Sequence, residues 1–274
     1  MDLQMIALCV ESIMDEIITE RADGILRLQL NRPAKKNALT SAMYVALAEV
    51  FNDAAKNDNV NTVLWHGAGD SFCAGNDVED FLRNPPGTGE SPQSRLMQAL
   101  IAFDKPLIAA VRGAAIGGGT TMLTHCDLVY ASENAKFQTP FIDLALVPEF
   151  GSSYLIPLRA GHLRAAEIIL LGSPFGPTRA MELGLVSHVV PDDELLETAT
   201  AAARKLAAKS SVALQAAKRL MKQPFLEQVR AAIAAENKEF SVRVRSADAK
   251  EALAAFLEKR PPNFGRPHSS EAAR

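Results

Sequence analysis

Leu107-Ile108-Ala109-Ala110-Val111-Arg112-Gly113-Ala114-Ala115-Ile116-Gly117-Gly118-Gly119 joins a short apolar run to a turn of small residues. An apolar run of this length bounded by turn residues is typical of a buried strand. Where a helix begins in such a turn, its first backbone N–H groups are unpaired and can bind a negative oxygen. The glycines would equally serve a tight turn where a helix packs close to a strand. The spacing by itself therefore leaves ligand binding and packing both open.

A second turn of small residues comes earlier in the chain. Phe72-Cys73-Ala74-Gly75-Asn76-Asp77 follows the apolar run Val63-Leu64-Trp65. Unpaired N–H groups from the two turns, aimed at one point, would form an oxyanion hole. The glycines of Gly67-Ala68-Gly69 and Ala74-Gly75 lack the G-x-G-x-x-G spacing of a dinucleotide site, and no P-loop lysine accompanies them. We therefore disfavour a nucleotide cofactor.

The leading candidate for proton transfer is Glu149, in the sequence Leu146-Val147-Pro148-Glu149-Phe150-Gly151. Desolvation by these apolar neighbours would raise the pKa of the carboxyl toward the range that a general base needs. The alternative is an ordinary acid at a helix N-terminus before Gly151-Ser152-Ser153. For Asp77, at the start of a short predicted helix, capping is the favoured role.

Strands alternate with helices through the first two-thirds of the chain. Asp23-Gly24 predicts a hairpin between strands at 17–19 and 25–30, and Thr40 predicts the N-cap of a helix that ends near Lys56. Further strands are expected at 62–66, 106–111, 127–131 and 136–138, with helices at about 93–103 and 118–124. This order predicts a layered α/β core.

The pattern changes after residue 191, where alanine-rich helical sequence runs to Lys259. Pro191-Asp192-Asp193 predicts the helix start, and Pro224 and Ser246 interrupt the helical sequence. We interpret the chain as a core over residues 1–191, a helical C-terminal subdomain over 192–260, and a flexible polar tail over 261–274. The first ten residues lack the basic segment of a signal peptide, and we expect a loose extension there.

Composition limits the possible functions. The chain has 274 residues, of which 48% are hydrophobic and 22% charged, as in ordinary soluble globular proteins. A net charge of −3 disfavours nucleic acid as the main partner. No apolar run approaches the roughly 20 residues of a membrane span. The odd, widely spaced Cys9, Cys73 and Cys126 predict neither a disulfide framework nor a metal site, and we expect a reducing compartment.

Two basic pairs could hold phosphate groups. Lys35-Lys36 follows Asn31-Arg32-Pro33, and Lys259-Arg260 lies near the C-terminus. A short pair of like charges is also common on a solvated surface. The residues alone thus indicate an α/β enzyme with an anion hole and one buried acid.

Longer stretches of the chain resemble the crotonase superfamily, the enoyl-CoA hydratase/isomerase family. They are Leu30-Asn31-Arg32-Pro33, Asn37-Ala38-Leu39, Lys105-Pro106-Leu107-Ile108-Ala109-Ala110-Val111, Cys126-Asp127-Leu128-Val129-Tyr130-Ala131 and Phe256-Leu257-Glu258-Lys259-Arg260. The resemblance covers nearly the whole chain. It implies a crotonase (ClpP-like) spiral of ββα units whose helical C-terminal part serves trimerisation, in a homotrimer or a dimer of trimers.

The resemblance also implies a site. Family members bind an acyl-CoA thioester and stabilise its enolate with two backbone N–H groups, which match Asn76 and Gly118 here, beside Glu149 as catalytic base. The implied CoA-binding residues are Lys36, Ala38, Ala74, Gly75, Asp77 and Phe141, with Phe256 and Lys259 reaching a CoA held by a neighbouring subunit. No metal or redox cofactor is expected, since coenzyme A is part of the substrate.

Two departures from the family pattern select a branch. Hydratases carry one glutamate just after the triple glycine and another after a Gln-Thr-Pro-like stretch, where this chain has Thr121 and Phe141. Concerted hydration is therefore predicted to be lost. Glu149 matches the single catalytic glutamate of peroxisomal-type Δ3,Δ2-enoyl-CoA isomerases, which implies an isomerase of fatty-acid oxidation.

Two alternatives stay open. One is another reaction of the family, such as dienoyl- or ring-acyl-CoA isomerisation or weak hydration. The other is a non-catalytic acyl-CoA-binding protein. The final residues Ala272-Ala273-Arg274 carry no Ser-Lys-Leu-type peroxisomal address, so we expect a bacterial cytoplasmic protein.

Overall fold

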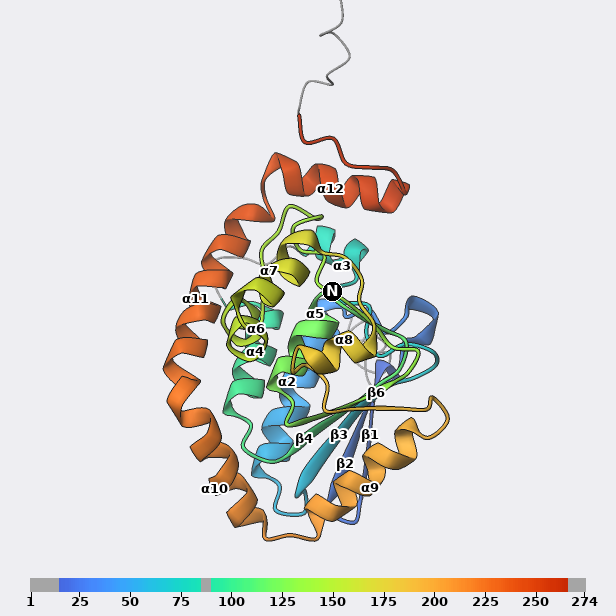
Figure 1. Cartoon of the computed structure of the whole chain (residues 1–274), viewed down its shortest axis with the longest axis vertical. Coiled ribbons are helices and arrows are strands. Elements are labelled where there is room, and N and C mark those ends of the chain that lie inside the picture. Colours follow the sequence, from blue (N-terminus) through green and yellow to red (C-terminus); the bar gives the residue numbers. More distant parts are fainter. Residues whose placement is uncertain (1–14, 85–89, 266–274) are drawn as a thin grey trace, which may run out of the picture.

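The computed structural model describes residues 15–84 and 90–265, and within them the main element is a six-stranded sheet. Its strands lie side by side in the order β1 (Ile17–Ala22), β2 (Ile25–Leu30), β3 (Thr62–Gly67), β4 (Leu107–Val111), β6 (Leu128–Ser132) and β8 (His188–Val190) (Figure 1). β1 pairs with β2 in antiparallel fashion, as the predicted hairpin around Asp23-Gly24 requires. The other pairs are parallel.

A smaller parallel sheet of β5 (Ala114–Ile116) and β7 (Lys136–Gln138) stands beside the main one. The small-residue turn at 72–77 is attached to it, because the N–H of Cys73 donates to the Ala114 carbonyl at 2.9 Å. The Cys73 carbonyl in turn accepts from the Ile116 N–H, also at 2.9 Å. These two hydrogen bonds hold the two turns predicted from the sequence side by side.

Helices cover both faces of the main sheet. On one face α2 (Ser41–Lys56) packs against α4 (Pro92–Ala102) over a fully buried aromatic group of Phe51, Trp65 and Phe103. On the other face α9 (Leu195–Ala207) packs on β3, β4 and β6 (Figure 1). Side chains alternate between the faces along a strand, so Leu64 faces α9 while Trp65 faces the aromatic group.

The remaining elements build the rim of the molecule. They are the helices α3 (Val78–Arg83), α5 (Gly118–Thr121), α6 (Ser152–Ala160), α7 (His162–Leu171), α8 (Pro177–Glu182), α10 (Ser211–Lys222), α11 (Leu226–Arg243) and α12 (Ala247–Glu258), and the 3-10 turns η1 (Pro33–Lys35), η2 (Met122–His125) and η3 (Gln223–Phe225). α10 and α11 run along one edge, and α12 lies across one end (Figure 1).

Most boundaries match the expectations from the sequence. The Thr40 hydroxyl accepts the Met43 N–H at 3.2 Å, and the capped helix ends at Lys56 as predicted. Pro224 falls in η3, and Ser246 caps α12, which confirms both interruptions. Only part of the helix expected at 118–124 is α-helical, because η2 replaces its second half.

The helix start predicted at Pro191-Asp192-Asp193 is wrong, because α9 begins at Leu195. The Asp192 side chain instead forms hydrogen bonds with residues at the ends of β4 and β6. Its Oδ1 accepts from the Ser132 hydroxyl at 2.6 Å and from Arg112 Nε at 2.9 Å. A carboxylate held by these two tertiary partners belongs to the loop that precedes the helix.

Two expectations lie partly or wholly outside the described residues: the N-terminal extension and the last part of the tail. Pro261 to Gly265 are exposed and irregular. No helix in the described ranges is long and apolar enough to cross a membrane.

A buried asparagine joins the loop before α2 to the turn after β3. Asn37 is fully buried, its Nδ2 donates to the carbonyls of Ala68 and Ser71 at 2.9 and 2.7 Å, and its Oδ1 accepts the Arg32 N–H at 2.8 Å.

Asn37→Ala should therefore lower the free energy of unfolding by about 3 kcal/mol, because it leaves three backbone groups without partners. Urea denaturation measures the loss. Asn59→Ala at an exposed position is the matched control and should change little. Equal stability of the two variants would contradict this role for Asn37.

Candidate active site

The two small-residue turns meet at their glycines. A Cβ atom on Gly75 would lie 2.8 Å from the Ile116 carbonyl oxygen and 3.8 Å from the Gly118 nitrogen. Within residues 15–84 and 90–265, neither the Asn76 nor the Gly118 N–H donates to a backbone or side-chain acceptor. The Leu39 backbone hydrogen-bonds to the residues on either side of Asn76, namely Gly75 and Asp77, and leaves the Asn76 N–H unused. The Gly118 N–H is unused because Gly118 is the first residue of α5. Two free donors thus lie close together.

The Glu149 carboxyl lies against the same place. A Cβ atom on Gly118 would lie only 2.9 Å from Glu149 Oε1. The residue is 4% exposed, and its Oε1 is buried without a hydrogen-bond partner. Burial, and after it the negative charge of Glu236, raises the pKa of Glu149 to about 8. A carboxyl with that pKa can both take and return a proton near neutral pH.

The triple glycine serves packing and ligand access at different residues. Gly119 meets the packing need, since its Cβ would lie 2.3 Å from the Cys73 carbonyl oxygen. Gly117 has a φ of +56°, a conformation that side chains rarely adopt. Of the three glycines, Gly118 is the one that faces Glu149 with its N–H free. The spacing left ligand binding and packing open, and the triple glycine serves both, packing at Gly119 and ligand access at Gly118.

Tyr44 lies between these groups, and the sequence analysis missed it. Its hydroxyl donates to Asn76 Oδ1 at 2.9 Å and would lie 3.3 Å from a Cβ on Gly118. The side chain is fully buried, and burial followed by the nearby Glu149 carboxyl raises its pKa well above the usual value. It therefore remains a neutral hydroxyl that fixes the Asn76 side chain. A tyrosine on the buried face of the helix, beside Leu47, was the available signal.

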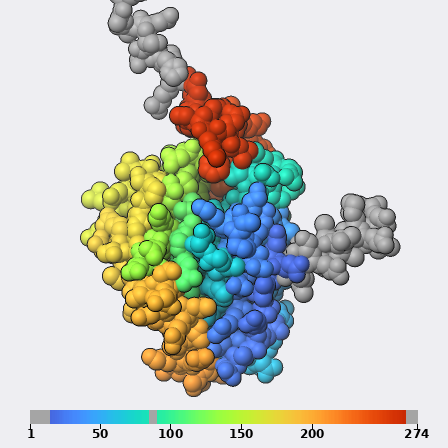
Figure 2. Space-filling view, turned by 90° about the vertical axis from the view of Figure 1, so that its right-hand side faces the viewer, coloured from blue at the N-terminus to red at the C-terminus, as the bar shows by residue number. Residues whose placement is uncertain are grey.

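Asn76, Gly118 and Glu149 line a cavity of about 100 Å³. Its apolar wall comes from α3, the segment 140–146, α11 and α12, and it includes a Phe81–Phe240 pair with ring centroids 6.0 Å apart. In Figure 2, α12 (red) projects from the end of the molecule next to α3 (teal). The lining residues are Ala74, Gly75, Asn76, Val78, Phe81, Ile116, Gly117, Gly118, Pro140, Phe141, Leu144, Leu146, Glu149, Phe240, Leu253 and Phe256.

The cavity brings together most, but not all, of the residues predicted from the sequence. Lys36, Ala38, Asp77 and Lys259 do not line it. The Lys36 carbonyl accepts the Ala74 N–H at 3.0 Å, so the backbone of the exposed Lys36 lies beside a residue that lines the cavity. Lys259 is the exposed C-cap of α12.

Asp77 has the predicted capping role. Its side chain accepts the Asp80 N–H at 3.0 Å and pairs with Arg32 Nη1 at 2.7 Å. Phe256 lines the cavity of its own chain and is 60% exposed, and its expected contact with a CoA of a neighbouring subunit stays a prediction.

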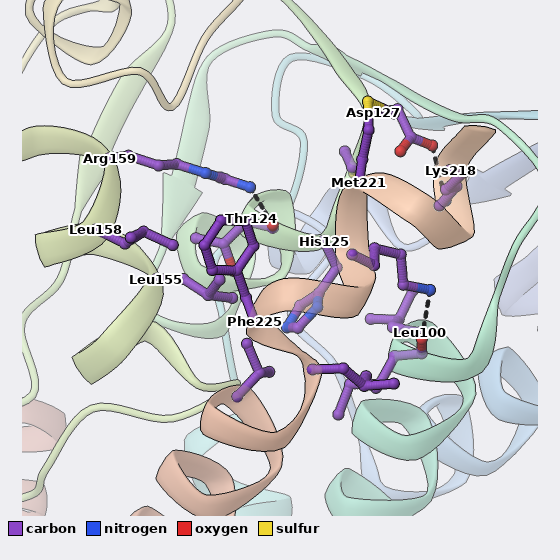
Figure 3. Close-up of a pocket in the computed structure, with 15 residues that line it drawn as sticks. Leu100, Thr124, His125, Asp127, Leu155, Leu158, Arg159, Lys218, Met221 and Phe225 are labelled. Carbon is purple, nitrogen blue, oxygen red and sulfur yellow. Dashed lines mark hydrogen bonds and ion pairs between the residues drawn. The ribbon is translucent and has the colours of Figure 1, made fainter.

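A larger cavity of about 510 Å³ lies between α4, η2, α6, α10 and α11 (Figure 3). Its cationic side chains are engaged within the chain: Arg159 donates to the Thr124 carbonyl, and Lys218 pairs with Asp127 at 2.7 Å. His125 connects this cavity to the site, because its Nε2 lies 2.7 Å from the Phe150 carbonyl. A carbonyl only accepts, so Nε2 carries the proton, and burial lowers the pKa of His125 to about 4, which keeps the ring neutral.

Comparison with known proteins gives a consistent family. The enoyl-CoA hydratase/isomerase model matches residues 20–267. A 2,3-dehydroadipyl-CoA hydratase of Escherichia coli is 36% identical over 92% of this chain and 99% of its own. Human enoyl-CoA delta isomerase 2 is 32% identical over 90% of this chain and 64% of its own. The crystal structure of an enoyl-CoA hydratase/isomerase from Pseudoalteromonas atlantica superposes with a TM-score of 0.86 at 37% identity, covering 91% of this chain and 99% of that one.

The raised pKa of Glu149 makes stability depend on pH. Between its ordinary value of 4.5 and about 8, the folded protein holds a proton that the unfolded chain has lost, so stability falls as the pH rises through this window. Glu149→Gln removes this fall. The variant should gain more stability over the wild type at about pH 8.5 than at about pH 5 in urea denaturation. The exposed Glu133→Gln is the control, and an equal effect of Glu149→Gln at both pH values would contradict the burial of a protonated carboxyl.

Proposed function

Because the chain belongs to the enoyl-CoA hydratase/isomerase family, we propose that it moves the double bond of a 3-enoyl-CoA to give the trans-2-enoyl-CoA. The observation that carries the proposal is one buried carboxyl, Glu149, beside the N–H groups of Asn76 and Gly118. Among the described residues, Glu149 Oε1 and both N–H groups have no hydrogen-bond partner. The delta isomerase relative is consistent with it.

In the proposed reaction the thioester oxygen accepts hydrogen bonds from the Asn76 and Gly118 N–H groups. The ionised Glu149 removes a proton from C2, and the electrons of that C–H bond move into the thioester to form a dienolate. The same carboxyl then gives the proton to C4, so that the C3–C4 double bond becomes a C2–C3 double bond. Loss of one oxyanion donor costs about 10²–10³ in rate in other enzymes.

The number of acids on the described wall of the cavity supports isomerisation over hydration. Among the described residues that line the cavity, Glu149 is the one acid. Thr121 is fully buried, with its hydroxyl 3.3 Å from the Gly117 carbonyl, and Phe141 contributes an apolar wall. An attacking water would find no second base there. The proton transfer is complete with one carboxyl and two N–H donors, so the proposed reaction requires no metal or redox cofactor.

We further propose that the exposed basic residues Lys36 and Lys259 bind phosphates of the CoA moiety, with Ala38 and Asp77 beside its path. The Lys36 backbone is hydrogen-bonded to Ala74, which lines the cavity. A lysine at that edge can reach an anionic group outside the acyl cavity while the thioester lies inside.

The second candidate is hydration, which the similarity to a hydratase favours. Ultraviolet absorbance separates the two. With 3-hexenoyl-CoA, an isomerase gives a rising conjugated enoyl band, and with trans-2-hexenoyl-CoA it gives no decay. Decay of the conjugated band would show hydration and contradict the isomerase assignment.

Glu149→Gln should lower turnover of 3-hexenoyl-CoA by about 10³ or more, because it removes the proton acceptor. CoA affinity, measured by calorimetry, should stay within a few-fold of the wild type. Glu133→Gln is the control for the lost charge. Near-full activity of the Glu149 variant would reject the mechanism.

We also propose a homotrimer or a dimer of trimers. The most exposed large apolar side chains on α7 and α10 support an interface, since large apolar surface is rarely left bare. They include Leu163, Leu170 and Leu171, which are 83%, 62% and 66% exposed. Light scattering should give three or six times the chain mass of 29.5 kDa. Leu163→Glu should reduce that mass, and a monomeric wild type would contradict the proposal.

A further inference from the structure

The turn that carries Glu149 has an unusual backbone. Phe150 and Gly151 both have positive φ, at 61° and 71°. A non-glycine residue in this region is strained, and such strain persists only where the surroundings hold it. Gly151 is also the N-cap of α6 and has no side chain with which to accept hydrogen bonds. The turn therefore depends on partners from elsewhere in the chain.

The side chain of Glu236, on α11, supplies those partners. Its Oε2 accepts the Gly151 N–H at 2.7 Å, and its Oε1 accepts the Ser153 N–H at 2.8 Å. Glu236 is 6% exposed and caps the start of α6 across 85 positions of sequence. Burial raises the pKa of the Glu236 carboxyl above its usual value, and the N–H donors on both oxygens oppose that rise by favouring the ionised form.

Apolar and polar contacts fix the rest of the turn. A Cβ on Gly151 would lie 3.3 Å from both Ile233 and Val229 side chains, so α11 packs tightly there. On the opposite side, neutral His125 donates to the Phe150 carbonyl.

Among the described titratable groups that face Glu149, Glu236 is the one whose charge changes the pKa of Glu149. Tyr44 from α2 and Cys73 from the turn at 72–77 are fully buried, and burial raises the pKa of both, so they are neutral. His125 from η2 is neutral as well. Glu236, from α11, is the second carboxyl near the base, and its charge favours the protonated form of Glu149.

We propose that Glu236 is a positioning residue for Glu149, which it affects in two ways: it caps the strained turn that carries the base, and it places a buried negative charge behind it. This proposal goes beyond the isomerase assignment, and its catalytic meaning rests on that assignment. The two effects make different predictions, because capping requires hydrogen-bond geometry and the electrostatic effect requires only the charge.

Two variants separate these effects. Glu236→Gln removes the charge and replaces one acceptor oxygen with an amide nitrogen. Glu236→Asp keeps the charge but shortens the side chain by one methylene. The control is Glu239→Gln, an exposed position one turn further along the same helix that removes the same formal charge.

The Glu149 titration can be followed without substrate by carboxyl ¹³C NMR, with the signal assigned by its absence in Glu149→Gln. Its midpoint should fall by about one pH unit or more in Glu236→Gln. It should stay near the wild-type value in Glu236→Asp and in Glu239→Gln. An unchanged midpoint in Glu236→Gln would overturn the electrostatic part of the proposal.

Amide hydrogen exchange at Gly151 and Ser153 tests the cap. Exchange should accelerate at least about tenfold in Glu236→Asp and Glu236→Gln but not in Glu239→Gln. Unchanged protection in Glu236→Asp would overturn the capping part. Neither readout uses an acyl-CoA, so a protein that fails to isomerise 3-hexenoyl-CoA but shows both shifts would reject the proposed function and keep this inference.

If the isomerase assignment also holds, the acid limb of the kcat/KM profile should move to lower pH in Glu236→Gln by the same amount as the titration. A purely structural role would lower kcat without moving that limb. A drop in rate at unchanged profile would therefore overturn the electrostatic role.

Discussion

The arrangement of the site depends on the pair of hydrogen bonds between Cys73 and the strand Ala114–Ile116. They join the loop after β3 to the second sheet. Within the described part of the chain, the N–H of Asn76 in that loop and the N–H of Gly118 after β5 have no acceptor. Two donors on loops that were not joined could move relative to each other. Here the two donors share one short ladder, and Gly119 packs directly against the Cys73 carbonyl. Preorganised donors of this kind stabilise developing negative charge without moving during the reaction.

Burying a carboxyl beside these donors is costly, and the fold meets that cost by protonation. The cavity offers Glu149 Oε1 no hydrogen bond and surrounds it with apolar side chains. The acid is therefore retained at the expense of stability above neutral pH. Such a site suits a group that must alternate between its two protonation states, whereas a structural carboxylate would be satisfied by donors.

Local signals in the sequence predicted much of the fold. Asp23-Gly24 and Thr40 act through neighbouring residues, so the hairpin and the α2 start followed from the sequence alone. The glycine turns and Glu149 were also predicted, because small residues and an acid among apolar neighbours are unusual in themselves. The CoA-binding roles of Lys36 and Lys259 and the oligomer stay predictions.

Partners distant in sequence could not be predicted in this way. Tyr44, His125 and Glu236 reach the site across 32, 25 and 85 positions, respectively, and each looks like an ordinary helix or turn residue in its own segment. Asp192 is a case where such partners made a local prediction wrong. Because its side chain binds Ser132 and Arg112, the helix begins at Leu195 and not at the expected position. Glu236 had one local signal, a charged residue in the buried stripe with Val229, Ile233 and Phe240, and a single charge in such a stripe does not say what it binds.

The contrast between the two buried glutamates assigns their roles. Glu236 has a backbone N–H on each oxygen, whereas Glu149 Oε1 has none. Equal carboxyls in unequal surroundings titrate apart, and the one with more hydrogen-bond donors keeps its charge more readily. Burial raises the pKa of both carboxyls, but hydrogen bonds oppose the rise only at Glu236. Glu149, the group that faces the cavity, therefore holds its proton more tightly, and Glu236, the group that faces the backbone, ionises first. Exchanging those surroundings would leave the charge facing the substrate cavity and the proton where no substrate could receive it.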